Sequence, residues 1–138
     1  MKSFEEALAR LTNVGVNVAG VDVPDSEGTA RIAIKFSNGA VLNTYYWRLI
    51  QNGRAELSSF DHQQKYGLPE SIDAKAQISG LLSGTICNAV QLDSETADLT
   101  LVFSESTKLQ VFNFSGYEMW EFQFPDGAVE YSNYALGE

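Results

Sequence analysis

The stretch ADLTLVFSESTKLQVFNFSGYEMWEFQFPDGAVEYSNY, residues 97–134, alternates apolar and polar side chains in two separate runs. Leu99, Leu101 and Phe103 are the apolar positions of the first run. This period of two predicts β-strands with one buried face. Pro125-Asp126-Gly127 predicts a turn after the second run, because proline fixes φ and glycine accepts a positive φ. Connections this short join antiparallel neighbours, so the stretch predicts an antiparallel sheet.

The same pattern occurs in the first half of the chain. DSETADLTLVFS (93–104) matches DSEGTARIAIKFS (25–37), and WEFQFPDGAVEYSNY (120–134) matches WRLIQNGRAELSSF (47–60). Self-similarity at this spacing predicts two copies of one supersecondary unit. The copies span about residues 14–60 and 85–135, joined by a loop and a helix over residues 61–84.

Two short helices complete the predicted fold. Ser3 and Glu6 form a capping-box pattern ahead of an amphipathic helix that ends near residues 13–15. In the linker, Ser71 or Asp73 can cap a helix that ends at Gly84. Its predicted buried face comprises Ala74, Ile78, Leu81 and Leu82. The predicted class is therefore α+β, a single domain over residues 1–138. It is mainly antiparallel sheet built from two duplicated β-meanders, with an N-terminal helix and one helix between the copies.

Length and composition indicate an intracellular globular protein. A chain of 138 residues is long enough to bury a core without a disulfide or metal, and Cys87 has no cysteine to pair with. The N-terminus carries acids where a signal peptide has an apolar core, and the chain contains no apolar run of membrane-spanning length. We therefore expect a cytoplasmic protein that does not bind membranes.

The net charge of −9 is concentrated in the second half of the chain. Residues 1–88 hold nine acids and eight bases, a net charge of −1, whereas residues 89–138 hold nine acids and only Lys108 as a base, a net charge of −8. Such a charge repels nucleic acid and favours a basic protein partner. The alternative is that the acids only keep the protein soluble.

No motif in the sequence predicts catalysis. His62 is the only histidine, so a site with several histidines is excluded, and we expect Asp61 and His62 to form local hydrogen bonds. Cys87 has no neighbouring base to activate it and is expected to be a small buried residue. The acidic turns at residues 25–27 and 93–95 lack the ordered oxygen ligands and glycine bend of a calcium loop, so they are expected to be solvated turns. No metal site and no cofactor are predicted, and the protein is not expected to be an enzyme.

Acidic and aromatic residues of the second copy form the candidate binding surface. Acids steer a basic partner, and tyrosine is a frequent anchor at interfaces. Asp98, Glu121 and Glu130 are expected on the sheet face opposite the apolar residues. The candidate partner-binding residues are Asp98, Tyr117, Glu118, Glu121, Asp126, Glu130, Tyr131 and Tyr134.

Several segments together resemble a small bacterial domain family. They are WRLI with its glycine turn, SSFDHQQKYGLP (58–69), ADLTLVF, LQVFNFSGYEMWEF and PDG, within about residues 28–135. The family is similar to immunity proteins of contact-dependent growth inhibition and polymorphic-toxin systems. The resemblance implies a non-enzymatic inhibitor that binds one cognate toxin domain, in many cases a basic nuclease. It assigns no contact residue.

Two other functions stay open at this point. One is a small carboxylate-dependent enzyme, which a deep pocket with converging acids would favour. The other is a structural module that associates with itself through exposed sheet edges. The blocking of a basic toxin by a monomer or weak dimer is the function that the sequence favours.

Overall fold

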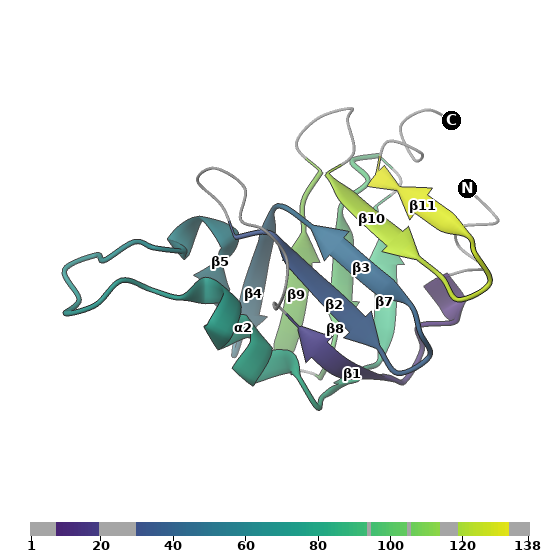
Figure 1. The fold of residues 1–138 in the computed structure, drawn as a ribbon, viewed down its shortest axis with the longest axis horizontal. Helices are drawn as coiled ribbons and strands as arrows, with labels where there is room; N and C mark the ends of the chain where they lie inside the picture. Colours follow the sequence, from purple (N-terminus) through teal and green to yellow (C-terminus); the bar gives the residue numbers. More distant parts are fainter. Residues whose placement is uncertain (1–7, 20–29, 94, 105, 114–118, 133–138) are drawn as a thin grey trace.

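The computed structural model describes residues 8–19, 30–93, 95–104, 106–113 and 119–132. These residues form two antiparallel β-sheets packed face to face, with one helix at the side of the stack (Figure 1). The hydrophobic core lies between the sheets and beneath the helix. The predicted α+β class with mainly antiparallel sheet is confirmed.

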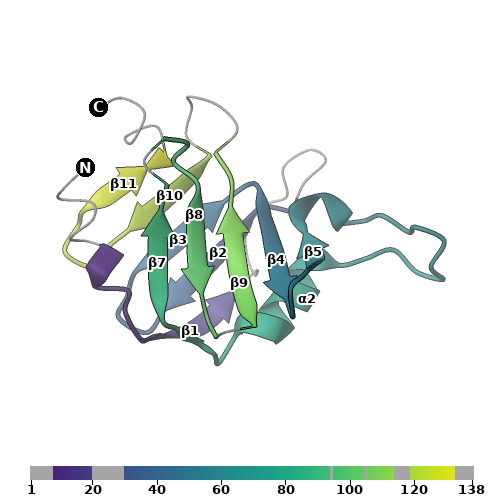
Figure 2. The same cartoon turned by 180° about the vertical axis from the view of Figure 1, so that it is seen from behind.

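The first sheet has six strands and the second has five, seen from opposite sides in Figure 1 and Figure 2. In order across the six-stranded sheet lie β11 (Val129–Tyr131), β10 (Trp120–Gln123), β3 (Val41–Thr44), β2 (Ile32–Phe36), β1 (Val14–Ala19) and β6 (Ile86–Cys87). In order across the five-stranded sheet lie β5 (Arg54–Ser58), β4 (Trp47–Gln51), β9 (Thr107–Val111), β8 (Leu99–Val102) and β7 (Ala89–Leu92).

Each half of the chain contributes to both sheets. The first half places β1, β2 and β3 in the six-stranded sheet and the β4–β5 hairpin in the five-stranded sheet. The second half places β7, β8 and β9 in the five-stranded sheet and the β10–β11 hairpin in the six-stranded sheet. The prediction that the sheet is built from two duplicated β-meanders is not confirmed, because each half crosses from one sheet to the other after its third long strand.

The crossing in the first half occurs at Tyr45 and Tyr46. Residues 41–51 read as one continuous strand, but the structure divides them into β3 and β4. Thr44 and Trp47 are both buried although they are three residues apart, a spacing that places side chains on opposite faces of a continuous strand. Both can be buried only because the chain changes sheets between them. The run from residue 85 to 93 divides in the same way, since β6 pairs with β1 and β7 pairs with β8.

Matching tryptophans lie just after the two crossings. Trp47 Nε1 donates a hydrogen bond of 2.7 Å to the carbonyl of Ala30, and Trp120 Nε1 donates one of 2.7 Å to the carbonyl of Ala97. Each indole is only 1% exposed, so these bonds satisfy buried donors. Each bond also joins the strand after a crossing to a residue just before a strand of the opposite sheet in the same half, β2 for Ala30 and β8 for Ala97.

The helix between the halves, α2 (Ala74–Leu82), packs against β1 and β5. Asp73 is its N-cap and accepts a hydrogen bond from the backbone N–H of Ala76, at 3.0 Å. The predicted face is largely confirmed: Ala74, Ile78 and Leu82 are buried, whereas Leu81 is 39% exposed. Of the predicted N-terminal helix, residues 8 and 9 are helical, and residues 1–7 lie outside the described part of the chain.

Candidate partner-binding site

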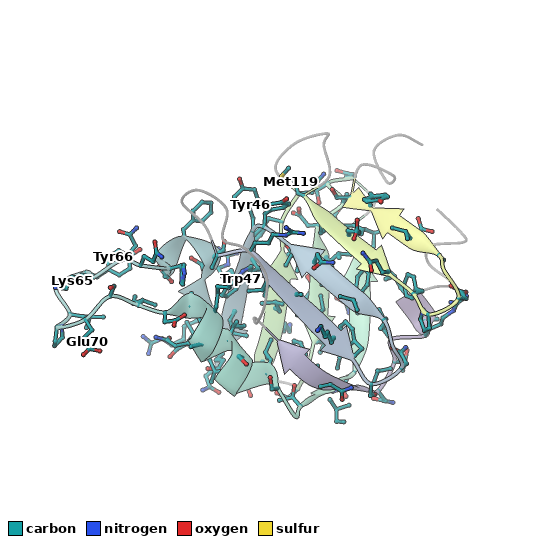
Figure 3. The ribbon with its side chains drawn as sticks, viewed as in Figure 1. Tyr46, Trp47, Lys65, Tyr66, Glu70 and Met119 are labelled. Atoms are coloured by element: carbon teal, nitrogen blue, oxygen red, sulfur yellow. The ribbon has the colours of Figure 1, made fainter. Side chains whose placement is uncertain are left out.

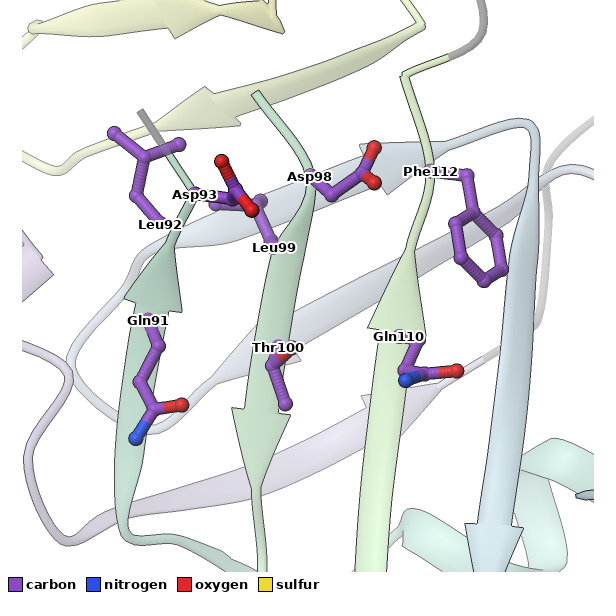
Figure 4. Close-up of a pocket in the computed structure, with 8 residues that line it drawn as sticks. All are labelled: Gln91, Leu92, Asp93, Asp98, Leu99, Thr100, Gln110 and Phe112. Carbon is purple, nitrogen blue, oxygen red and sulfur yellow. The ribbon is translucent and has the colours of Figure 1, made fainter. Parts of the chain in front are cut away.

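The outer face of the five-stranded sheet carries a shallow pocket of about 410 Å³ at the end where β7 and β8 meet their connecting turn (Figure 4). No other described element lies over this face (Figure 2). The outward side chains of three neighbouring strands line the pocket. Its lining residues are Gln91, Leu92, Asp93, Asp98, Leu99, Thr100, Gln110 and Phe112.

Asp93 and Asp98 lie at the two ends of the turn that joins β7 to β8. Their main chains are paired, since the N–H of Asp93 donates to the carbonyl of Asp98 at 2.9 Å. One oxygen of each carboxylate is used locally: Asp93 Oδ1 accepts from the backbone of Glu95, and Asp98 Oδ1 accepts from the backbone of Asn113 at 2.7 Å. Within the described residues, the second oxygen of each carboxylate has no hydrogen bond. The turn therefore presents one free carboxylate oxygen at each of its two ends.

A third acceptor lies next to this turn. Asn113 donates its side-chain N–H to the carbonyl of Thr96 at 3.0 Å, which ties the turn to the end of β9. Its Oδ1 atom is buried and has no hydrogen-bond partner within the described residues. Because this atom is buried and Asn113 does not line the pocket, it cannot meet a ligand there. The acceptors that the pocket presents are the second carboxylate oxygens of Asp93 and Asp98, and acceptors select a ligand that donates.

The floor of the pocket is a row of polar side chains across the strands. Gln91 pairs with Thr100, Thr100 with Gln110, and Gln110 with Arg48. Arg48 donates from Nε and Nη2 to the side-chain oxygen of Gln110, at 2.8 and 2.5 Å. An arginine has only donors, so the oxygen of Gln110 must face it and the amide nitrogen must point back across the row, as Figure 4 shows.

Arg48 is the cation nearest to this row, and it is already engaged. Besides Gln110, its guanidinium lies over the ring of Phe112, 5.1 Å from the ring centroid. No lysine or arginine lines the pocket within the described residues, and neither Asp93 nor Asp98 forms an ion pair there. The pocket consequently carries two carboxylates that lack an ion-pair partner in the described part of the chain, on a surface open to another molecule.

The predicted binding residues do not form one surface. Asp98 lies on the five-stranded sheet, whereas Glu121 and Tyr131 lie on the outer face of the six-stranded sheet. There they share a small pocket of about 100 Å³ with Arg31. Tyr117, Glu118 and Tyr134 lie outside the described residues.

Two predicted acids have roles within the fold. Asp126 pairs with Arg10 at 2.8 Å, and the backbone N–H of Ala128 together with Arg10 lowers the pKa of its carboxyl. The expectation that Glu130 faces outward is wrong. It pairs in register with the buried Phe122, so it points toward the inner side of the edge strand, where burial raises its pKa.

Asp61 makes the local contacts expected of it, whereas His62 bonds to Ala74, 12 positions along the chain. Asp61 accepts hydrogen bonds from the backbone of Ser58 and from the hydroxyl of Tyr66. His62 Nδ1 accepts from the backbone N–H of Ala74 at 3.1 Å, which satisfies a free donor at the start of α2. Both residues therefore support the linker between the two halves.

Cys87 is buried, as expected, and burial raises the pKa of its thiol to about 11. Within the described residues, no group of three His, Cys, Asp or Glu side chains could hold a metal ion. No helix among them is long and apolar enough to cross a membrane. Comparison with protein-family models, curated proteins and solved structures finds no match.

Sequence reasoning missed most of the pocket. Asp93 was expected to be a solvated turn residue, and Gln91, Thr100 and Gln110 were not candidates. The available signal was that these three polar residues take outward positions on three successive strands. Their pairing across the strands could have been inferred from the short turns between them.

Proposed function

We propose that this protein binds and blocks a basic protein, in the manner of an immunity protein that neutralises a cognate toxin domain. The observation that carries the proposal is the pair of carboxylates, Asp93 and Asp98, which have no ion-pair partner among the described residues and lie on a sheet face that no other described element covers. A lysine or arginine side chain of the partner would enter the pocket and donate to both carboxylates. The resemblance of the sequence to immunity proteins supports the same function.

The negative charges of the protein can act on a basic partner at two stages, during approach and in the bound complex. The net charge of −9 attracts a cationic partner from a distance and can raise the association rate by about 10–10³-fold at low salt. In contact, the partner's cation is removed from water between two carboxylates. A standard interface of about 800 Å² on each partner is broad enough to include the pocket and the polar row beside it.

The test is co-expression with toxin domains encoded by the neighbouring genes, with growth as the readout. The wild-type protein should restore growth against one of them, and purified complexes should form more slowly as ionic strength rises. If no neighbouring toxin is neutralised, the proposal is wrong.

The double variant Asp93→Asn/Asp98→Asn tests the site itself. Asparagine keeps the side-chain oxygen that accepts from the backbone, so the turn is retained. The charge is lost, and the second acceptor oxygen of each side chain becomes an NH2 donor. Losing a charge partner in an interface costs about 2–5 kcal/mol, so we expect at least a thirtyfold rise in the dissociation constant. Glu56→Gln, an exposed acid on β5, is the matched control and should leave the affinity unchanged.

A further inference from the structure

Residues 63–71 form an arm that projects beyond both sheets (Figure 3). It leaves the 3-10 helix η1 (Ser59–Asp61) and returns to the start of α2. All nine of its residues are exposed, including Tyr66 at 66% and Leu68 at 50%. The segment contributes nothing to the core, so the stability of the fold does not explain its exposed tyrosine and leucine. Binding to another molecule would explain them.

Backbone hydrogen bonds fix the base of the arm. The N–H of Gln63 donates to the carbonyl of Ile72 at 2.7 Å, and the N–H of Ile72 donates to the carbonyl of Gln64 at 2.8 Å. Below these bonds, His62 is fixed to the first residue of α2. The two ends of the arm are therefore joined as in a short hairpin.

The tip has an unfavourable backbone conformation. Tyr66 has φ +46° and Gly67 has φ +79°, so two successive residues occupy the left-handed region. Glycine adopts this region freely, but a bulky tyrosine rarely does. Among the described residues, the Tyr66 side chain makes one hydrogen bond, from its hydroxyl to Asp61 Oδ1 at 2.9 Å, and this bond ties the ring to the base of the arm. Strain of this kind is found where a side chain is positioned for binding.

We infer that residues 63–71 are a preformed arm that enters a cleft in the protein partner, with Tyr66 and Leu68 as its anchors. The inference rests on the proposed function. A narrow projection can bury an aromatic and a leucine only in a concave surface, because a flat partner would touch the tip alone. Lys65 and Glu70 make the arm electrically neutral, so its contribution is contact area rather than charge. Tyrosine suits this role because it buries a large area with little loss of side-chain entropy.

The first test measures affinity for the toxin domain, in a catalytically inactive form, that the growth assay retrieves. Tyr66→Ala and Leu68→Ala should each raise the dissociation constant by about thirtyfold or more, the effect of losing a binding hot spot. Lys65→Ala, a neighbouring exposed side chain on the same arm, is the matched control and should change it less than threefold. Thermal melts of the free variants should match the wild type, since these side chains pack against no core residue.

The outcomes separate the two proposals. If Tyr66→Ala and Leu68→Ala both bind the toxin with wild-type affinity, the proposed role of the arm is wrong and the proposed function is unaffected. If the wild-type protein neutralises no neighbouring toxin, both proposals are wrong. A second measurement needs no partner: ¹⁵N heteronuclear NOEs of residues 63–71 in the free protein should be close to those of the sheets. Values typical of a disordered loop would overturn the preformed arm.

Discussion

At the scale of the residue, two indole N–H groups form hydrogen bonds between the two sheets, and each bond joins residues of the same half of the chain. Trp47 and Trp120 reach the carbonyls of Ala30 and Ala97, and all four residues are buried. No water can replace either bond, so each tryptophan contributes both its packing and the satisfaction of a buried carbonyl.

We expect Trp47→Phe and Trp120→Phe each to lower the free energy of unfolding by about 2–4 kcal/mol, through a cavity and an unsatisfied carbonyl. Urea denaturation followed by circular dichroism measures this loss. A loss below about 1 kcal/mol for either variant would mean that its bond has little weight in the native state.

Glu130 gives the fold a pH dependence of known sign. Because burial raises its folded-state pKa, it contributes stability that is fully present below its unfolded pKa of about 4.5 and is lost as pH rises through the folded value. Glu130→Gln should therefore be more stable than the wild type at pH 7 and equal to it at pH 3. Unfolding curves across this range test the prediction: equal stabilities of the two proteins at pH 7 would contradict it.

At the scale of the element, α2 depends on two residues that precede it. Asp73 accepts from Ala76, and His62 accepts from Ala74, so two of the free N–H groups at the start of the helix are satisfied by side chains. The sequence left Ser71 and Asp73 as equal candidates for the cap, and the structure selects Asp73.

Asp73→Ala should lower the free energy of unfolding by about 1 kcal/mol, the usual effect of losing an N-cap. Ser71→Ala, an exposed residue two positions earlier, should change it by less than about 0.5 kcal/mol. Equal effects of the two substitutions would show that the cap is not specific to Asp73.

At the scale of the whole molecule, the exchange of hairpins makes the two halves dependent on each other. β4 lies between β5 and β9, and β10 lies between β11 and β3, so each hairpin pairs with a strand of the other half. The same exchange places the acidic second half on both sheets, which separates Asp98 from Glu121.

Neither residues 1–83 nor residues 84–138 should fold alone, because each half would leave a hairpin and a three-stranded layer without a covering sheet. Circular dichroism of each fragment should lack a cooperative melt, and mixing the two should restore one. A cooperative melt for either isolated fragment would show that the exchanged hairpins are dispensable.

The sequence by itself determined the antiparallel class, the linker helix with most of its buried face, and the buried faces of the strands near residues 32–36, 99–103 and 120–124. These features follow from local patterns: the period of two in residues 99–103, the glycine turns, and the cap before Ala74. Local patterns also placed Asp98 on an outward face, where it lies. They could not show that Glu130 points inward, because that depends on its pairing with Phe122.

Only the tertiary structure decided which sheet each strand joins. The choice depends on contacts between residues far apart in the chain, such as Leu42 with Phe122 and Leu49 with Leu109, and no local period encodes them. That choice brought Asp93, Asp98 and the row from Gln91 to Gln110 together and moved Glu121 to the other face. The proposed binding site therefore depends on strand pairing, whereas the strands themselves depend on the alternation of apolar and polar residues.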